Sequence, residues 1–243
     1  MDKRVILVTG GNGQLGSEIG RFFLTVTAND TVWLATHRNT DRAEAFAAQF
    51  PGRCKTVSLD VTSQEAWADA AQRISAESGP ITVLVNNAGK HDDALLANMP
   101  IETWNDVLQT NLQSVFLGCQ AVLPQMISQR RGRIINIASL SALLPPPGQT
   151  NYAAAKAGVV ALTQSLAKEV ARIGITVNSI CPGYLETEVF TSLPEAQLDE
   201  VRRRIPMRRL GRPEEIAAAV FFLATEAASY ITGSSLKIDG GLL

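Results

Sequence analysis

A short apolar run that passes directly into a cluster of glycines is the feature that most constrains the fold of this chain. Residues 5–9 read Val-Ile-Leu-Val-Thr, which is typical of a strand buried on both faces of a parallel sheet. Four glycines lie within the next seven residues, and a helical pattern through Ile19, Phe22 and Phe23 follows them. The sequence therefore predicts a strand, a tight turn and a helix, as in a doubly wound α/β fold.

This turn can hold the diphosphate group of a dinucleotide. Glycines let the backbone approach the diphosphate closely, and the start of the helix offers N–H groups and a positive dipole. An ordinary strand–helix loop is the alternative interpretation, but one glycine would suffice for it. We therefore expect six residues of the turn to contact a cofactor: Gly10, Asn12, Gly13, Gln14, Leu15 and Gly16.

The end of the second expected strand, residues 31–36, indicates which dinucleotide binds. In a dinucleotide-binding fold an acidic residue at this place takes the ribose 2′-hydroxyl of NAD. Here the strand runs into His37 and Arg38, and no carboxylate is present. An arginine can pair with a 2′-phosphate, so the sequence predicts NADPH or NADP+ as the cofactor. Alternatively, Arg38 is simply solvated at the end of a strand.

Two further strand ends carry candidate cofactor contacts. Asp60 and Val61 follow the third expected strand, and the Asp60 carboxylate could accept a hydrogen bond from an adenine amino group. An equally good alternative is that Asp60 caps the next helix together with Thr62 and Ser63. After the fourth strand, Asn87 can fasten a loop through backbone hydrogen bonds, and the small residues Ala88 and Gly89 leave room for a flat group.

Tyr152 and Lys156 form a candidate proton-donating pair. Their i, i+4 spacing places both side chains on one face of an expected helix. An ammonium close to a tyrosine stabilises the phenolate, which would lower the tyrosine pKa and make the hydroxyl a usable acid. Ser139 ends the apolar run 133–138, as a side chain at a strand tip would. Taken alone, the pair could be a chance spacing in a surface helix.

Composition excludes several other classes. The chain has 22 Lys and Arg against 23 Asp and Glu, so no net charge attracts it to nucleic acid. Cys54, Cys119 and Cys181 are widely spaced and form no CxxC pair, which predicts buried, reduced thiols. With only two histidines, we expect neither a metal site nor a His-based triad.

The chain shows no sign of a membrane segment, an exported leader or a second domain. No apolar stretch approaches the roughly 18 residues that a membrane-spanning helix needs, and no signal-like segment precedes the first strand. There is no internal repeat or low-complexity linker. We therefore expect one domain over residues 1–243, located in the cytoplasm, with no membrane or nucleic-acid partner.

Together, the order and spacing of these motifs resemble the short-chain dehydrogenase/reductase family. The resemblance runs from Val5 to Gly241. Within the family the chain is most similar to the bacterial 3-oxoacyl-[acyl-carrier-protein] reductases. The stretches that carry this similarity are residues 104–112, 132–136, 151–158, 174–178 and 233–241.

The resemblance implies a single Rossmann-type α/β domain, doubly wound, with a mainly parallel seven-stranded sheet and helices on both faces. It also implies reduction by NADPH of a 3-oxoacyl thioester held on a carrier protein, in a homotetramer. A catalytic tetrad is implied at Asn111, Ser139, Tyr152 and Lys156, with Asn111 holding a water inside the long helical stretch 100–129. Tyr152 and Lys156 would also contact the cofactor.

The family pattern adds cofactor contacts after the sixth strand and a flap over the site. The contacts correspond to Pro182, Gly183, Leu185 and Thr187, and the flap, or lid, to residues 186–212. Arg130 matches a carrier-binding arginine of the related reductases, whereas Arg172 is one residue out of register. A solvated basic surface is an equally good interpretation of these arginines.

One position departs from the family pattern. The single-domain branch carries TGxxxGxG, whose second glycine would fall on Gln14, and NADP-preferring relatives often place a basic residue where Gly13 stands. Two alternatives to the carrier-protein activity therefore remain. The same machinery could reduce another substrate, such as acetoacetyl-CoA, a polyketide or polyene intermediate, or a sugar. The chain could also be a catalytically idle NADP(H)-binding regulator.

Overall fold

The computed structural model describes residues 3–38 and 40–243, which form an α/β fold around a seven-stranded sheet. The strand order is β3-β2-β1-β4-β5-β6-β7, and every neighbouring pair is parallel. The strands are β1 (Val5–Thr9), β2 (Thr31–Thr36), β3 (Cys54–Ser58), β4 (Val83–Asn86), β5 (Gly132–Ile137), β6 (Ile175–Pro182) and β7 (Ser235–Ile238). The predicted Rossmann-type, doubly wound fold is confirmed.

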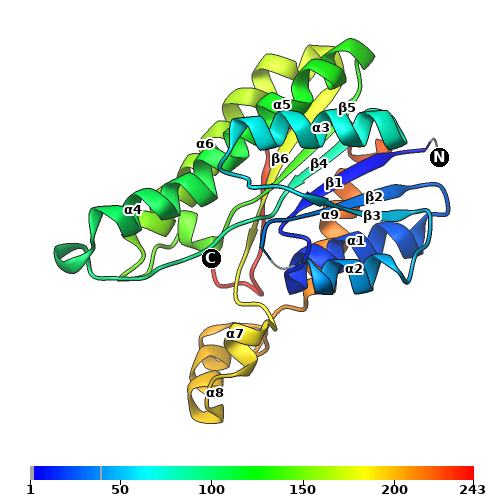
Figure 1. Cartoon of the computed structure of the whole chain (residues 1–243). Helices are drawn as coiled ribbons and strands as arrows, with labels where there is room; N and C mark the ends of the chain where they lie inside the picture. Colours follow the sequence, from blue (N-terminus) through cyan, green and yellow to red (C-terminus); the bar gives the residue numbers. More distant parts are fainter. Residues whose placement is uncertain (1–2, 39) are drawn as a thin grey trace.

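Helices cover both faces of this sheet (Figure 1). One face carries α1 (Gln14–Val26), α2 (Asp41–Ala47) and α9 (Pro213–Leu223), and the other carries α3 (Gln64–Ser78), α5 (Ser114–Gln129) and α6 (Thr150–Val170). The remaining helices are α4 (Ile101–Leu108), α7 (Glu188–Thr191) and α8 (Glu195–Arg204), with a π-helix at Gln109–Gln113 and 3-10 turns at Leu96–Asn98, Leu140–Ala142, Ala171–Ile173 and Glu226–Ala228. None of the helices in the described residues is long and apolar enough to cross a membrane.

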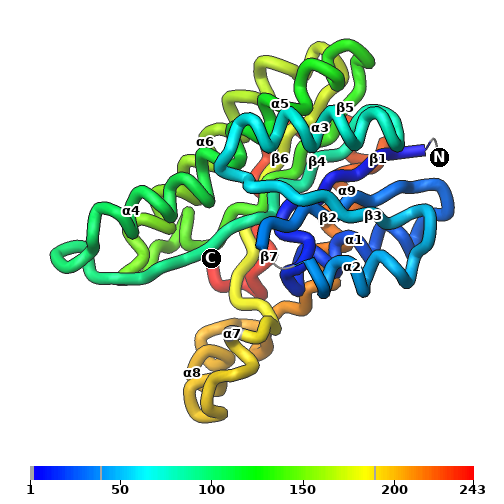
Figure 2. The backbone as a smooth tube through the Cα atoms, viewed as in Figure 1, coloured from blue at the N-terminus to red at the C-terminus, as the bar shows by residue number. Residues whose placement is uncertain are grey.

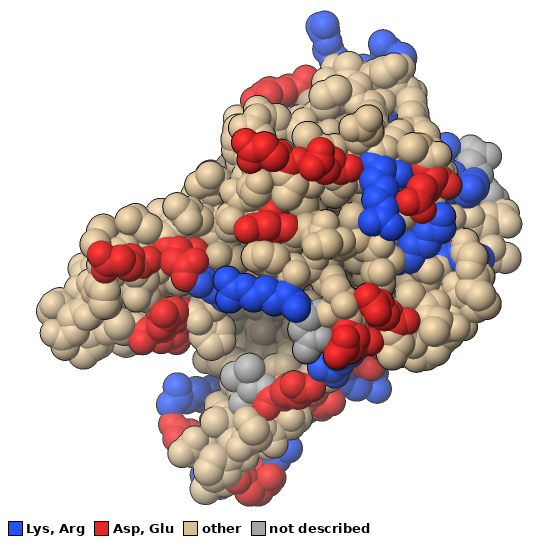
Figure 3. Space-filling model, in the orientation of Figure 1, with Lys and Arg blue, Asp and Glu red and all other residues tan. Residues whose placement is uncertain are grey.

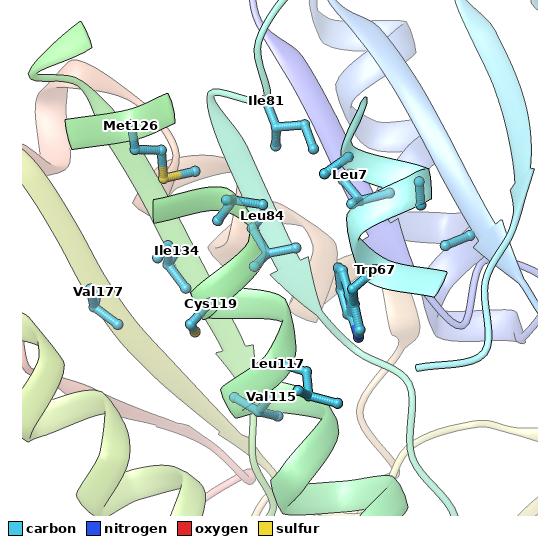
Figure 4. Close-up of a cluster of buried hydrophobic side chains, with 14 of the residues drawn as sticks. Leu7, Trp67, Ile81, Leu84, Val115, Leu117, Cys119, Met126, Ile134 and Val177 are labelled. Atoms are coloured by element: carbon cyan, nitrogen blue, oxygen red, sulfur yellow. The ribbon is translucent and has the colours of Figure 1, made fainter. Parts of the chain in front are cut away.

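The central strands separate two apolar cores. In β1, Leu7 faces the core under α3 and α5, whereas Ile6 and Val8 face the core under α1 and α9. Figure 4 shows the first core, where Trp67 of α3 lies over the sheet near Leu7. Burial on both faces explains why the strands read as continuous apolar runs.

The topology places a cleft at the carboxyl edge of the sheet. The chain winds in one direction from β1 to β3 and in the other from β4 to β7, so β1 and β4 are neighbours at the point where the order reverses. In open α/β sheets ligands bind at such a switch point, beyond the carboxyl ends of the strands. The turns that follow β1, β4, β5 and β6 all meet there.

The predicted 186–212 flap is a separate small lobe. Helices α7 and α8 project from the body of the domain, as Figures 1 and 2 show. The lobe has its own apolar cluster of Leu198, Ile205 and Leu210, against which Leu242 of the carboxyl tail is packed. Leu242 therefore packs within its own chain, while Leu243, the last residue, is half exposed.

Candidate active site

A cleft of about 330 Å³ lies at this carboxyl edge and is lined by half of the predicted site residues. Figure 3 shows the surface hollowed between the α7–α8 lobe and the body of the domain. The cleft is lined by Leu15, Asn87, Gly89, Lys90, His91, Ile137, Ala138, Ser139, Tyr152, Lys156, Pro182, Gly183, Leu185, Thr187 and Phe190. Residues from both ends of the chain thus share one site.

The Ser139 and Tyr152 side chains lie close together in the cleft. Ser139 lies two residues beyond the end of β5, where its Oγ accepts a hydrogen bond of 3.1 Å from the Ser141 N–H. Burial raises the pKa of Tyr152 above its ordinary value, and the nearby Ser139 side chain only partly offsets that rise. The expectation that Lys156 lowers the tyrosine pKa is therefore wrong for the polypeptide alone, because burial of the phenol dominates.

Lys156 lies one helical turn after Tyr152, with its Nζ atom 5.7 Å from the centre of the tyrosine ring. The Nζ atom donates to the main-chain carbonyl of Ile137 at 2.9 Å, and the residue is buried. Burial lowers the pKa of Lys156 to about 8. A lysine held in this way can change protonation state near neutral pH, which a solvated lysine cannot.

Asn111 is held rigidly by a local change in helix type. The stretch 100–129 was predicted to be one long helix, but residues Gln109–Gln113 form a π-helix between α4 and α5. The Asn111 amide donates to the carbonyls of Lys90 (2.7 Å) and Val107 (2.9 Å) and accepts from the Lys90 N–H (3.2 Å). Single π-turns within α-helices are frequent at functional sites. Here the turn aims a fully buried amide at the loop after β4.

Gly89 fits between two members of the predicted tetrad. A Cβ atom built on Gly89 would lie 2.7 Å from Asn111 Oδ1 and 3.4 Å from Lys156 Nζ. Asn111 and Lys156 therefore approach the same point of the chain from two different helices. This placement brings Asn111, Ser139, Tyr152 and Lys156 into one neighbourhood, and their joint role in catalysis stays a prediction.

The glycine turn is packed so tightly that three of its glycines cannot carry a side chain without a shift, and a Cβ at Gly11 would lie 2.5 Å from the Leu34 Cβ. Gly10 adopts a φ of +68°, and a Cβ at Gly16 would lie 2.3 Å from the Gly10 carbonyl oxygen. Gly13 differs, because its φ of −76° suits any residue. The first turn of α1 is thus drawn against the end of β1, with its unpaired N–H groups at the carboxyl edge of the sheet.

The loop after β4 is fastened to this turn as the sequence predicted. The Thr9 hydroxyl accepts from the backbone N–H groups of Asn87 and Ala88, each at 2.9 Å. The Asn87 side chain donates to the Thr9 carbonyl at 2.9 Å. These bonds lock the ends of two adjacent strands together and fix one wall of the cleft.

Gln14, the departure from the family pattern, spans the cleft. Its Nε2 atom donates to the main-chain carbonyl of Glu186 at 3.0 Å, which joins the first turn of α1 to the loop after β6. Its Oε1 atom is buried and has no hydrogen-bond partner.

The expected adenosine end of the cofactor site lies at the carboxyl ends of β2 and β3. Asp60 Oδ1 accepts from both the N–H (2.9 Å) and the hydroxyl (2.7 Å) of Thr62. These bonds lower the pKa of Asp60, with smaller contributions from His37 and Arg38. Ser63 caps α3 by accepting from Ala66, so Asp60 is not the cap residue.

Arg38 and Val61 complete this end of the site. Arg38 is exposed beside Asp60, and the Val61 carbonyl accepts from the Trp67 indole at 3.0 Å. Contacts of Arg38, Asp60 and Val61 with a nucleotide stay predictions.

Five residues that line the cleft were missed by the sequence reasoning: Lys90, His91, Ile137, Ala138 and Phe190. Lys90 and His91 directly follow the predicted Asn87–Gly89 segment, and their position after a cofactor loop was the available signal. The His91 ring lies edge-on to the Tyr152 ring, with 6.2 Å between the centroids. Phe190 is an isolated aromatic in a polar segment, and it packs edge-on against Tyr184.

The structure separates the arginines from the cleft. Arg130 and Arg172 directly precede β5 and β6, so they lie at the amino edge of the sheet, opposite the cleft. Within the lid, Arg202 and Arg204 pair with acidic residues of α8, and Arg209 pairs with Glu215. These ion pairs favour the interpretation that the arginines of the lid belong to a solvated surface and do not bind a carrier protein.

The cysteines have no part in the site chemistry. Cys54, Cys119 and Cys181 are buried and free, as predicted. Burial raises the pKa of Cys181, which lies near Lys156, so its thiol is a poor nucleophile. Among the described residues, no group of three or more His, Cys, Asp or Glu side chains is arranged to hold a metal ion.

Comparison with known proteins agrees with this geometry. A family profile described as "Enoyl-(Acyl carrier protein) reductase" matches residues 18–243. The chain is 39% identical over 243 residues to "3-oxoacyl-[acyl-carrier-protein] reductase FabG" of Thermotoga maritima, covering 100% of this chain and 99% of the relative. Proteins of the same name from Chlamydia trachomatis and Escherichia coli are 41% and 40% identical, covering 98% of this chain and 97% of each relative. The chain therefore belongs to the short-chain dehydrogenase/reductase family, whose members are oxidoreductases acting on CH–OH or C=O groups.

Proposed function

We propose that this protein reduces a 3-oxoacyl thioester, held on an acyl carrier protein, to the 3-hydroxyacyl thioester with NADPH. The observation that carries the proposal is the convergence of Ser139, Tyr152 and Lys156 on one cleft beside the glycine turn. The relatives are named for this reaction and align along the whole chain.

The residues present fit a dinucleotide cofactor. A side chain at Gly16 would fill the space at the first turn of α1, where unpaired N–H groups suit a diphosphate. No carboxylate follows β2, and the exposed Arg38 suits a 2′-phosphate. The missing carboxylate and the exposed Arg38 both support NADPH over NADH. When bound, the nicotinamide supplies the hydride that reduces the ketone carbon.

The polypeptide contributes orientation and a proton. The Ser139 and Tyr152 hydroxyls can both hydrogen-bond the ketone oxygen, and the Tyr152 hydroxyl donates its proton as the alkoxide forms. Because burial raises the pKa of Tyr152, the phenol stays protonated at neutral pH, which is the state that reduction needs. In this mechanism Lys156 would hold the cofactor ribose and pass a proton to the phenolate left on Tyr152. It would then regain a proton from solvent through a water held near Asn111.

The surface supports a homotetramer, and we propose a cytoplasmic location. Ile101 of α4 and Phe116 of α5 are exposed, and a groove of about 530 Å³ beside them is lined partly by Leu108, Leu112 and Leu162. An apolar helical face of this kind suits burial against a second copy of the chain.

A panel of substrates tests the proposal directly. NADPH oxidation is measured with acetoacetyl groups on acyl carrier protein, on CoA and on N-acetylcysteamine, beside simple ketones and sugars. We expect the carrier-bound thioester to have the highest kcat/KM. Turnover confined to a sugar or a simple ketone would replace the proposed substrate, and silence across the panel together with NADPH binding would indicate a regulator.

A further inference from the structure

The Gln14 side chain joins the two walls of the cofactor cleft. Its neighbour Leu15 lines the cleft from the first turn of α1, and Thr187 lines it from the loop after β6. The 3.0 Å hydrogen bond from Gln14 Nε2 to the Glu186 carbonyl connects these walls across 172 residues of sequence. A glycine at position 14 would leave the gap open.

The bond acts on the base of the lid. The Glu186 N–H donates to the Gly211 carbonyl at 2.8 Å, and Leu185 forms an isolated parallel bridge with Gly211. Residue 186 is thus held on its N–H side by the far end of the lid and on its carbonyl side by Gln14. Thr187, the next residue, is the N-cap position of α7 and makes no capping bond with its side chain. Gln14 therefore helps to fix where this loop lies.

This bond is well suited to opening. Gln14 Oε1 is buried without a donor, and leaving a buried acceptor unpaired costs free energy. When the amide swings out, it loses one hydrogen bond but returns the unpaired oxygen to water. The two effects oppose each other, so the closed arrangement is only modestly favoured.

We propose that Gln14 is a cofactor-positioning residue that clasps the loop 185–187 to the first turn of α1. The clasp opens when NADP(H) enters or leaves the cleft, and it holds the loop against the cofactor when closed. This inference rests on the proposed function, because it assumes that NADP(H) lies between these two walls. It assigns a role to the one position at which the glycine turn departs from the family pattern.

A second tie between the same regions serves as a comparison. Arg42 of α2 and Glu188 of α7 form an ion pair of 3.0 Å, and both side chains are mainly exposed. Exposed pairs of this kind contribute little because water screens them. The Gln14 bond is also exposed, but it holds the main chain of the loop directly, whereas the ion pair joins two long side chains. We therefore expect the Gln14 bond, and not this ion pair, to control the loop.

Hydrogen exchange on the cofactor-free protein and NADPH dissociation kinetics test the clasp. In Gln14→Met, which keeps the side-chain length without the hydrogen bond, we expect amide exchange in residues 185–191 and NADPH dissociation each to be about fivefold faster, the factor that one ordinary hydrogen bond provides. Gln14→Lys restores a donor of similar reach and should return the exchange rate toward that of the wild type. Glu186→Gln and Arg42→Ala are matched controls, because the carbonyl acceptor remains in both, and neither should change the exchange rate.

Three outcomes would overturn the proposal. Unchanged exchange and dissociation in Gln14→Met, in a protein that binds NADPH, would overturn the clasp and leave the proposed function standing. If Gln14→Met and Arg42→Ala accelerated amide exchange equally, loss of any contact would make the loop more mobile, and the Gln14 bond would have no special role. A wild-type protein that binds no NADP(H) would overturn the proposed function and the cofactor role of Gln14 together.

Discussion

Lys156 Nζ donates a hydrogen bond of 2.9 Å to the main-chain carbonyl of Ile137, the last residue of β5. Ser139 follows two residues later, so the end of one strand positions both the ammonium and the serine hydroxyl. Because this places the lysine in a buried site, its pKa falls to about 8. The same burial raises the pKa of Tyr152. Lys156 and Tyr152 have similar pKa values in water. In this site the pKa of Lys156 is lowered and the pKa of Tyr152 is raised.

The lowered lysine pKa predicts a specific dependence of stability on pH. Lys156 titrates near pH 8 in the folded protein and near its ordinary value of 10.5 when unfolded. Between these two pH values the unfolded chain binds more protons at this lysine than the folded protein does, so the free energy of unfolding rises with pH. This gain is lost again as the pH falls through about 8. Relative to Lys156→Met, the wild type should gain about 2 kcal/mol in unfolding free energy from pH 7.5 to pH 10.

Urea unfolding of both proteins across this pH range provides the measurement. The difference between the two proteins cancels the titration of groups distant from Lys156, whereas Cys181, whose pKa Lys156 lowers, also responds to the substitution. A difference that stays constant with pH would show that Lys156 is not perturbed in the folded protein.

Removing the Tyr152 hydroxyl should separate binding from chemistry. In Tyr152→Phe the ring remains but the proton donor is lost, so we expect kcat to fall by about 10²–10⁴. NADPH affinity, measured by fluorescence titration, should stay within about threefold of the wild type, since the proposed cofactor contacts are made mostly by other groups. Tyr230→Phe is the matched control because Tyr230 is fully exposed. A Tyr152→Phe enzyme with near-normal kcat would exclude the tyrosine as the acid.

Sequence patterns predicted which residues meet in this cleft because the sheet is parallel. Ser139, Asn87 and Thr187 each follow a different strand, and parallel strands present their carboxyl ends at one edge. Once the strands were assigned from their apolar runs, the meeting of these residues followed. Tyr152 and Lys156 needed only helical spacing to share a face.

Other features depend on tertiary contacts that no local pattern encodes. The π-helix around Asn111 forms because its amide is bonded to Lys90, a residue on a different segment. The direction of the Tyr152 pKa shift depends on burial by surrounding segments. The bond from Gln14 to Glu186 joins residues that are distant in sequence, so the departure at Gln14 was visible but its partner was not.

Charge reversal at Arg38 should change the choice of cofactor. Arg38 is exposed at the end of β2, where a 2′-phosphate of NADPH is expected. In Arg38→Asp a carboxylate would repel that phosphate and could instead bond a ribose hydroxyl. We expect kcat/KM for NADPH, divided by kcat/KM for NADH, to fall by about tenfold or more. An unchanged ratio would show that Arg38 does not contact the phosphate.

The buried pair Arg4–Asp30 predicts a large loss of stability far from the cleft. Arg4 donates to both carboxylate oxygens of Asp30 at 3.0 and 2.5 Å, and its guanidinium lies 5.2 Å from the Phe23 ring centre. Asp30→Ala leaves the buried arginine charge unpaired, which should cost about 3–5 kcal/mol in urea unfolding. Glu200→Ala, which breaks an exposed pair with Arg204, should cost less than about 0.5 kcal/mol. Similar losses in both variants would contradict this account.

Gly16 and Gly13 of the cofactor turn should respond differently to substitution by alanine. Gly16 lies in α1, where alanine normally stabilises a helix by about 1 kcal/mol. Its new Cβ would, however, lie 2.3 Å from the Gly10 carbonyl oxygen and 2.9 Å from Asn87 Nδ2, so the turn must move. We expect Gly16→Ala to lower NADPH affinity at least tenfold and to destabilise the fold by about 1–3 kcal/mol.

Gly13→Ala is the control for that experiment. Gly13 is exposed, its φ is −76°, and its Cβ would come no closer than 3.3 Å to the Gly10 oxygen. A small shift relieves this contact, so NADPH affinity should stay within about threefold of the wild type and stability within about 1 kcal/mol. Fluorescence titration and urea unfolding measure both quantities. If the two variants bound NADPH equally well, close packing of the α1 turn against β1 would not be what shapes the cofactor site.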